Sequence, residues 1–390
     1  MIKGTLALGV KFVCAAVLAF AAMLVTPTAS WAAEPTLLTT FGSYAKPSGV
    51  AVDEATGNVF VSDSGAGTVV ISGPEGQAPA GVAAPYTLEG FSFCGEPSGV
   101  AVDNSPTSPS FGALYVADVC ANAVKKFELD PVSEEYELSE ELAASPAFAE
   151  PLGVFVDAHG DVFVADYGSS SVIEFDPSGV EINRIDTSAF FHPSSAATDA
   201  AGDLFVQGYG LSSAVYKWEA NGSGEIEATT TGTEVVGSGA TGVAVDSSSG
   251  LLYVTMGSRV DIYDATSATK EGEFGGSTLA ASERLAVDES NAHVFVADAG
   301  NGNVAVFGPP PPPASPTILG ESVSGITDTE AILEATIRPE RASTSFHFEY
   351  GLDDCAISSC ASVPVPDGVL ETGNSAVAVK VPVAGLQPST

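Results

Sequence analysis

Carboxylates that end short apolar strands are the side chains of this 390-residue chain best placed to do chemistry. Four of them, Asp63, Asp118, Asp166 and Asp298, end the second strand of a repeated unit, and the connections expected at the same end of these strands carry Glu96 and Glu150. Hard divalent cations such as Ca²⁺ prefer clustered oxygen ligands. The spacing therefore predicts a site for a divalent cation, with Ca²⁺ as the candidate cofactor, or for a cationic partner group. The alternative is that each aspartate caps the loop that follows it, since Asp accepts backbone N–H bonds at turns.

The four histidines are not expected to form a metal site. His159 and His293 fall in turns at one end of the repeated strands, His192 falls at the opposite end, and His347 lies in a later segment. The three histidines of the repeats therefore cannot meet at one zinc ion. His192 with Ser194 and Ser195 suggests a serine nucleophile only superficially, because Pro193–Asp199 aligns with the repeated strand Pro47–Asp53. We assign no catalytic residue.

The cysteines indicate an oxidising compartment, because four of the five follow the N-terminal segment and an even number suits disulfides. Cys94 and Cys120 are expected at the same end of the second repeat, and we predict that they pair. We predict a second disulfide, Cys355 with Cys360, within one loop of the later segment.

A repeated pattern of three short strands, clearest in Pro151–Phe175 (PLGVFVDAHGDVFVADYGSSSVIEF), positions these residues. Its first strand ends at an aspartate, which we interpret as a turn initiator. The pattern occurs in six copies, and successive copies place this aspartate 42 to 54 positions apart: Asp53, Asp103, Asp157, Asp199, Asp246 and Asp288. Periods of this size with alternating strands are typical of a β-propeller. The acidic stretch Glu128–Glu150 in copy two is expected to be a solvated loop.

The two ends of the repeat array are complementary. Copy six has no fourth strand after Phe307, because the chain enters a run of prolines. Leu37–Phe41 precedes the first copy and resembles the fourth strand of copy five. We therefore predict that this N-terminal strand completes the sixth blade, which removes the open edges of the ring.

Beyond the propeller, residues 309–316 form a proline-rich linker and residues 317–390 a second domain. Ala331–Ile337, Ser345–Tyr350 and Ala376–Val381 alternate as the strands of a β-sandwich do. The sequence ends before the last strands that such a sandwich needs. We therefore expect an incomplete β-sandwich domain from a longer product.

The N-terminal residues 1–32 have the features of a secretory signal peptide. Lys3 and Lys11 precede the uncharged run Phe12–Val25, and small residues precede a cleavage site after Ala32. The sequence therefore predicts a secreted or cell-surface protein with no membrane insertion after cleavage. Its formal net charge of −36 argues against nucleic acid as a partner, since it repels phosphate backbones.

The repeats resemble the NHL family. Pro47–Ser72 and Arg284–Phe307 resemble its G-[VI]-A-V-D, [LV]-[YF]-V-A-D and V-x-x-F elements, although Ser62 and Ser72 replace the alanine and the aromatic residue in the first segment and the first glycine is absent from the second. The later segment resembles the fibronectin type III-like modules of bacterial surface proteins, through GITDTEAILEATIRP and FHFEYG. The first resemblance implies a propeller fold that hosts binding scaffolds and a few enzymes, among them metal-dependent lyases and lactonase-like hydrolases.

These observations predict an all-β protein: an NHL-like six-bladed β-propeller over residues 34–308, followed by an incomplete β-sandwich. We expect a secreted, non-catalytic binding or scaffold module with an extracellular protein or polysaccharide ligand. The alternative is a propeller lyase or lactone hydrolase that depends on a divalent cation.

Overall fold

The computed structural model describes residues 9–13, 34–84, 86–94, 98–209, 213–227, 230–309, 315–339, 344–351, 360–370 and 376–386. The chain divides into two compact units, Ala29–Pro310 and a second unit of Met1–Thr28 with Pro311–Thr390. Within the described ranges, the only helical element is the short 3₁₀ turn Val119–Ala121. No helix in this part of the chain is long and apolar enough to cross a membrane.

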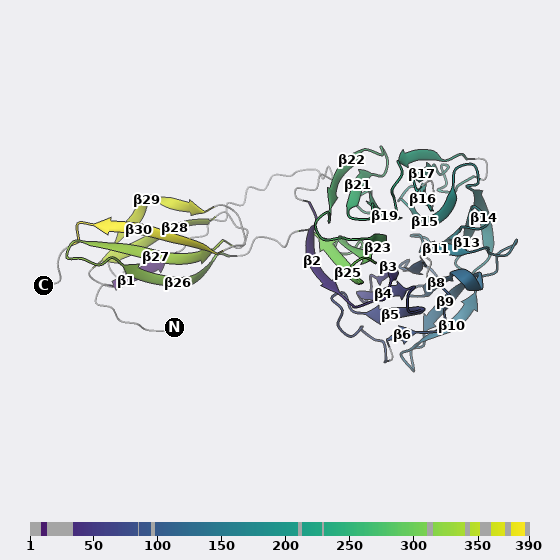
Figure 1. Cartoon of the computed structure of the whole chain (residues 1–390), viewed down its shortest axis with the longest axis horizontal. Coiled ribbons are helices and arrows are strands. Elements are labelled where there is room, and N and C mark those ends of the chain that lie inside the picture. The colour runs from purple at the N-terminus through teal and green to yellow at the C-terminus, as the bar shows by residue number, and fades with distance from the viewer. Residues whose placement is uncertain are drawn as a thin grey trace. The chain divides into compact units, whose positions relative to one another are not determined.

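The first unit is a six-bladed β-propeller, as the sequence predicted, and each blade is a four-stranded antiparallel sheet (Figure 1). Blades 1 to 3 contain β3 (Pro47–Asp53), β4 (Asn58–Asp63), β5 (Thr68–Ser72) and β6 (Thr87–Leu88); β7 (Val100–Val102), β8 (Leu114–Asp118), β9 (Ala123–Leu129) and β10 (Tyr136–Glu141); and β11 (Pro151–Val156), β12 (Val162–Asp166), β13 (Ser171–Phe175) and β14 (Glu181–Asp186).

Blades 4 to 6 follow the same order, except that the last blade takes its fourth strand from the start of the propeller. They contain β15 (His192–Thr198), β16 (Leu204–Tyr209), β17 (Val215–Trp218) and β18 (Thr233–Val236); β19 (Gly242–Asp246), β20 (Leu251–Thr255), β21 (Val260–Asp264) and β22 (Lys270–Phe274); and β23 (Ser282–Asp288), β24 (His293–Asp298), β25 (Asn303–Gly308) and β2 (Thr36–Phe41).

The ring closes through β2, which confirms the prediction made from Leu37–Phe41. This strand pairs antiparallel with β25, so that Phe41 lies opposite Val304. The first strands of neighbouring blades contact one another all the way around, and β23 contacts β3. The innermost strands β3, β11, β15, β19 and β23 can be followed around the centre of the ring in Figure 1.

The core of the propeller lies between blades. One cluster combines Val50 and Val61 of blade 1 with Phe295 and Val304 of blade 6, and similar clusters join the other neighbours. Second strands such as β4 are buried at every residue, because another blade covers each of their faces. This burial explains why they read as continuous apolar runs with few polar interruptions.

The glycine near the start of most first strands allows neighbouring blades to approach closely. A Cβ atom on Gly99 would lie 2.6 Å from the backbone nitrogen of Val154 in the next blade. A Cβ atom on Gly242 would lie 2.9 Å from the Cα atom of Arg284. Copy four has Ser195 and copy six has Arg284 at the same position of the repeat.

The second unit is a β-sandwich of two three-stranded sheets. One contains β26 (Thr317–Ser324), β27 (Glu330–Arg338) and β30 (Val377–Ala384), and the other contains β1 (Gly9–Val13), β28 (Thr344–Gly351) and β29 (Ala361–Leu370). Leu333 and Val379 of the first sheet share a core with Phe348 and Leu370 of the second.

Three of the sandwich strands were predicted, and β26 and β29 were not. Gly9–Val13, which the signal-peptide prediction assigns to a removed segment, pairs here with the edge of β28. The rest of residues 1–32 and most of the linker 309–316 lie outside the described residues. Cleavage of the signal peptide and incompleteness of the sandwich stay predictions.

Candidate functional site

A cavity of about 320 Å³ lies within the propeller and is lined by the first strands of all six blades. It therefore occupies the channel along the axis of the ring. Its walls are mostly small apolar side chains: Val50, Val52, Val100, Val102, Val154, Val156, Ala196, Val243, Val245, Ala286 and Val287. A pocket of this size and lining suits a small organic molecule.

Polar side chains gather at the end of the cavity where the first strands turn into the second strands. They occupy the position directly after the first-strand aspartate, and four blades contribute one each: Glu54, Asn104, Ser247 and Glu289. Blades 3 and 4 have Ala158 and Ala200 at this position. The polar residues therefore form an incomplete ring, which we call the channel rim.

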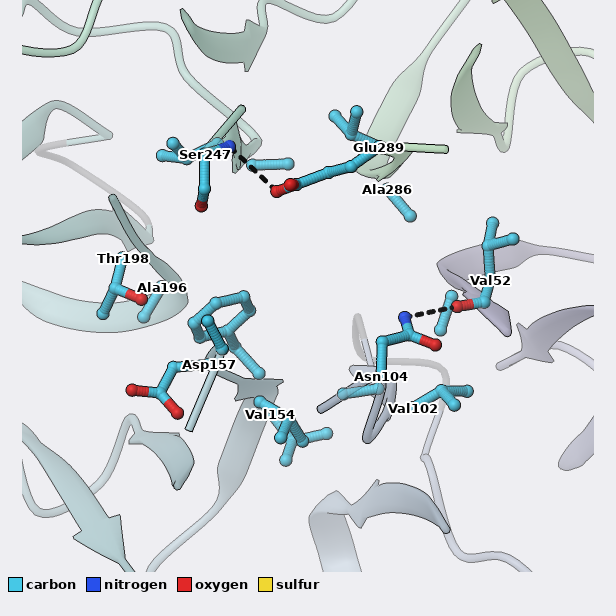
Figure 2. A pocket seen from close by; sticks show the side chains of 18 of the residues that line it. Val52, Val102, Asn104, Val154, Asp157, Ala196, Thr198, Ser247, Ala286 and Glu289 are labelled. Atoms are coloured by element: carbon cyan, nitrogen blue, oxygen red, sulfur yellow. Dashed lines mark hydrogen bonds between the residues drawn. The ribbon is translucent and has the colours of Figure 1, made fainter. Parts of the chain in front are cut away.

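Hydrogen bonds between neighbouring blades fix the rim side chains. The Asn104 amide donates to the carbonyl of Val52 at 2.9 Å and accepts from the Glu54 backbone N–H at 3.0 Å. Oε1 of Glu54 accepts from the Glu289 backbone N–H at 3.2 Å. Oε1 of Glu289 accepts from the Ser247 backbone N–H at 2.8 Å, and Figure 2 shows this bond at the edge of the cavity. In each of the two carboxylates, one oxygen thus accepts a backbone hydrogen bond from a neighbouring blade.

The surroundings of both rim carboxylates favour their protonated form. Burial raises the pKa of Glu54, and the nearby Glu289 raises it further. Burial also raises the pKa of Glu289, with a contribution from Asp246. A carboxylate with a raised pKa is a better general base near neutral pH than an ordinary surface carboxylate.

On the blade 3 side of the cavity, a histidine and an aspartate form a pair. Nδ1 of His159 lies 3.2 Å from Oδ2 of Asp157, and the His159 side chain is 81% exposed. The neighbouring Asp161 is half-buried, and burial raises its pKa to about 6. The mouth of the cavity therefore combines the rim carboxylates Glu54 and Glu289, whose pKa values are raised, with an exposed histidine.

The opposite end of the cavity carries the buried side chain of Arg284. Its Nη2 donates to the carbonyls of Leu152 and Ser194, at 3.0 and 2.8 Å. Burial lowers the pKa of this guanidinium to about 10. The cavity is thus acidic at the rim, apolar along its walls and cationic at its inner end.

The four aspartates predicted as metal ligands all hold the loop that leads into their own blade. Asp63 accepts from Ala45 and Lys46, Asp118 from Ser92 and the Lys125 ammonium, Asp166 from Ala149, and Asp298 from Ala281 and the Asn301 amide, at distances of 2.6 to 3.1 Å. The alternative, that each aspartate caps the loop that follows it, is seen for Asp63, which also accepts from the backbone N–H groups of Gly65 and Ala66 at 3.1 and 3.2 Å.

The two predicted glutamate ligands add no cluster to these aspartates. Glu150 is exposed, and its backbone N–H donates to Asn122, while Glu96 lies outside the described residues. Among the residues that the structure describes, no three His, Cys, Asp or Glu side chains are grouped to hold a metal ion. A cation at this face of the propeller has no support from the arrangement and stays a prediction.

The structure pairs Cys94 with Cys120, as predicted, with Cα atoms 6.2 Å apart. Cys360 is also disulfide-bonded. Its predicted partner Cys355 lies outside the described residues.

Neither His192 nor its neighbour Ser194 belongs to a nucleophilic site. Nδ1 of His192 lies 2.8 Å from Oγ of Ser170 and 2.9 Å from the Tyr167 carbonyl. The Ser194 hydroxyl is buried and accepts from Arg284 at 3.0 Å. The structural interpretation made from the sequence alignment is therefore supported.

The residues that define the cavity, namely Glu54, Asn104, Glu289 and Arg284, were not predicted from the sequence. Two signals could have found them. The position after each first-strand aspartate is polar in four copies and alanine in two, and Arg284 replaces the glycine of the repeat. Both signals depend on comparing the copies with one another at single positions.

Comparison with known proteins gives a partial family match. A family model described as the SMP-30/Gluconolactonase/LRE-like region matches residues 99–208, which include β7 to β16. No curated protein sequence matches the chain. A solved gluconolactonase from Xanthomonas campestris has a TM-score of 0.54 and 17% identity, over 71% of this chain and 90% of that chain. This likeness shows the propeller fold.

These comparisons correct one prediction. The expectation of a non-catalytic binding or scaffold module is wrong, because the family model that matches residues 99–208 describes gluconolactonase-like proteins. They favour the alternative, a propeller lyase or lactone hydrolase that depends on a divalent cation, of which the lactone hydrolase agrees with the matched family model.

Proposed function

We propose that the propeller hydrolyses small lactones in its channel cavity. The observation that carries this proposal is the pair of half-buried carboxylates, Glu54 and Glu289, at the mouth of an apolar cavity in a lactonase-like fold. The matched region supports the proposal, since it contributes Asn104 to the rim and both Asp157 and His159 to the mouth.

The chemistry requires one water molecule and two proton transfers. Either Glu54 or Glu289, as the carboxylate, takes a proton from water while the water oxygen bonds to the lactone carbonyl carbon. The ring C–O bond then breaks, the protonated carboxyl returns the proton to the leaving oxygen, and the product is a hydroxy acid. An amide has two N–H donors, so Asn104 can hold Val52 with one and polarise the lactone carbonyl with the other.

The resemblance to metal-dependent propellers implies a divalent cation, which would polarise the carbonyl and activate the water. The described residues do not fit such an ion well. Glu54 and Glu289 each hold a backbone N–H with one oxygen, and no third His, Cys, Asp or Glu in the described ranges completes a metal-binding group with them. We therefore derive no step through a metal.

Three further assignments are part of the proposal. We propose that the repeats are of the NHL type, that the second unit is fibronectin type III-like, and that the protein is secreted or held at a cell surface. The repeat motifs, the sandwich of β26 to β30 and the Cys94–Cys120 disulfide support them. An extracellular protein or polysaccharide partner stays a prediction.

The first test is hydrolysis of a panel of five- and six-membered lactones by the purified full chain, followed by proton release. Assays with EDTA and with added Ca²⁺ measure any cation dependence. We expect turnover by the wild type that rises with pH as the rim carboxylates ionise, and a loss of at least about a hundredfold in kcat for Glu54→Gln or Glu289→Gln.

Glu271→Gln is the matched control, because Glu271 is exposed on β22 and does not line the cavity. It should keep wild-type activity. Absence of turnover on every lactone, with and without cations, would reject the proposed function. Full activity in both rim variants would reject the assigned base.

A further inference from the structure

An arginine occupies the one repeat position where the propeller otherwise has only small residues. Copies one, two, three and five have glycine there, and copy four has Ser195. In those blades the position faces a neighbouring blade that leaves no space for a long side chain, as the contacts of Gly99 and Gly242 show. Arg284 therefore has to direct its side chain elsewhere, and it lines the channel cavity.

The side chain of Arg284 reaches across the channel and contacts three other blades. It starts from β23 in blade 6 and donates to Ser48 of blade 1 at 3.4 Å, to Leu152 of blade 3 at 3.0 Å, and to Ser194 of blade 4 at 2.8 Å. All three acceptors are backbone carbonyls near the start of first strands. Arg284 thus lies at the inner end of the cavity, away from the rim.

The positive charge of Arg284 is only partly compensated by the fold. Its four hydrogen-bond acceptors are the three carbonyls and the Ser194 hydroxyl, none of which carries a charge. Its Nε is buried without an acceptor. Glu283 on the same strand favours the charged form, but burial outweighs this effect and lowers the pKa. A buried guanidinium without a directly bonded anion is costly, and an anionic ligand would relieve that cost.

We propose that Arg284 anchors a carboxylate on the ligand of the channel cavity. The planar guanidinium is suited to carboxylates, which can accept two of its N–H groups. The valine walls then contact an apolar body, and the acidic rim disfavours the opposite orientation because Glu54 and Glu289 repel an anion. The inference deepens the proposed function: the substrate would be a lactone that carries an acid group on an apolar segment.

The cavity also limits the length of this ligand. Arg284 and Asp288, the last residue of β23, are four positions apart in the strand, which corresponds to roughly 13 Å at 3.3 Å per residue. This length sets the scale for the distance between the acid group and the reacting group of the ligand. Medium-chain carboxylates are short enough to serve as probes.

The test measures binding without turnover, by titration calorimetry of the full chain with hexanoate and octanoate and with the matching amides. We expect each acid to bind on the order of tenfold more tightly than its amide. Arg284→Met should remove this preference, and Arg284→Lys should keep part of it, because lysine retains the charge without the forked geometry. Arg259→Met is the control, since Arg259 pairs with Asp261 outside the cavity and its loss should change nothing.

Equal affinities for acid and amide in the wild type would overturn the proposal, and so would an unchanged preference in Arg284→Met. If Arg284→Met does not fold, the affinities of the wild type and of Arg284→Lys for acid and amide test the proposal. The result is independent of catalysis. If the protein binds acids more tightly than amides but hydrolyses no lactone, the carboxylate site is supported and the proposed function is rejected. If it hydrolyses lactones but binds acid and amide equally well, only the carboxylate site is rejected.

Discussion

Adjacent acidic residues at the ends of the first strands have different roles in this propeller. In blade 1, Asp53 accepts from the Ala55 backbone N–H at 3.0 Å and from the Thr56 hydroxyl at 2.6 Å, which builds the turn. Glu54 lies on the other face of the strand end and reaches the channel. The turn role of the aspartates was predicted from their residue type, because Asp favours such turns wherever they occur.

The channel role of the neighbouring position could not be predicted in the same way. A glutamate after a turn aspartate is usually a solvated surface group, and only the closure of the ring brings Glu54 next to Glu289 across a blade boundary. The two residues are 235 positions apart in sequence. The local sequence pattern gives no information about a contact between residues so far apart in the chain.

Glu174 provides a test of electrostatics inside a blade. It lies on β13, where burial raises the pKa of its carboxyl from 4.5 to about 7, while an Asn183 amide at 3.1 Å partly offsets this effect. Because this pKa is higher in the folded state than in the unfolded state, the protonated carboxyl of Glu174 stabilises the fold. This contribution is fully present below about pH 4.5 and is lost as the pH rises through about 7. We predict that Glu174→Gln raises the melting temperature more at about pH 8 than at about pH 5.

Differential scanning calorimetry at the two pH values measures this effect. Glu271→Gln is again the control, because it removes the same charge from an exposed position. Equal shifts for the two variants at both pH values would mean that the effect comes from the net charge of −36 and not from Glu174.

At the scale of elements, the short strands and their repeat were predictable because alternation and turn residues are local signals. The fourth strand of blade 2 shows the limit of this reasoning. The acidic stretch that was expected to be a loop contains β10, where Tyr136 is buried against Phe60 of blade 1 with ring centroids 5.3 Å apart. One buried aromatic and pairing with β9 are sufficient for a strand whose other residues are exposed.

The closing strand β2 is the element whose loss should matter most. Phe41 is 7% exposed and packs against blades 1 and 6, whereas Leu37 on the same strand is 44% exposed. We predict that Phe41→Ala lowers the free energy of unfolding of the propeller by about 3–5 kcal/mol. Leu37→Ala should cost less than about 1 kcal/mol.

Urea unfolding followed by tryptophan fluorescence reports on the propeller, because Trp218 is fully buried in blade 4. Similar losses of stability in the two variants would show that β2 does not close the ring through Phe41.

At the scale of the whole molecule, six copies of one pattern were sufficient to predict the all-β fold, the number of blades and the way in which the ring closes. The cavity was not predictable, because it is formed by one residue from each of several copies. The second unit was predicted less completely, since β29 contains Pro364 and Pro366, which are unfavourable in a strand.

The claim that the channel cavity is the active site is tested most directly by filling the cavity. Ala286 lies on β23 in the cavity wall, as Figure 2 shows, and Phe at this position would occupy the space of a substrate. The matched control is Ala78→Phe, at an exposed position in the loop after β5. Both variants are first compared with the wild type in melting temperature and then assayed for hydrolysis of the best lactone of the panel.

We predict that Ala286→Phe keeps a melting temperature near that of the wild type and loses at least about tenfold in kcat/KM, which corresponds to 1.4 kcal/mol of transition-state binding. Ala78→Phe should keep full activity. A folded Ala286→Phe variant that hydrolyses the lactone at the wild-type rate would contradict the account and place the reaction elsewhere in the molecule.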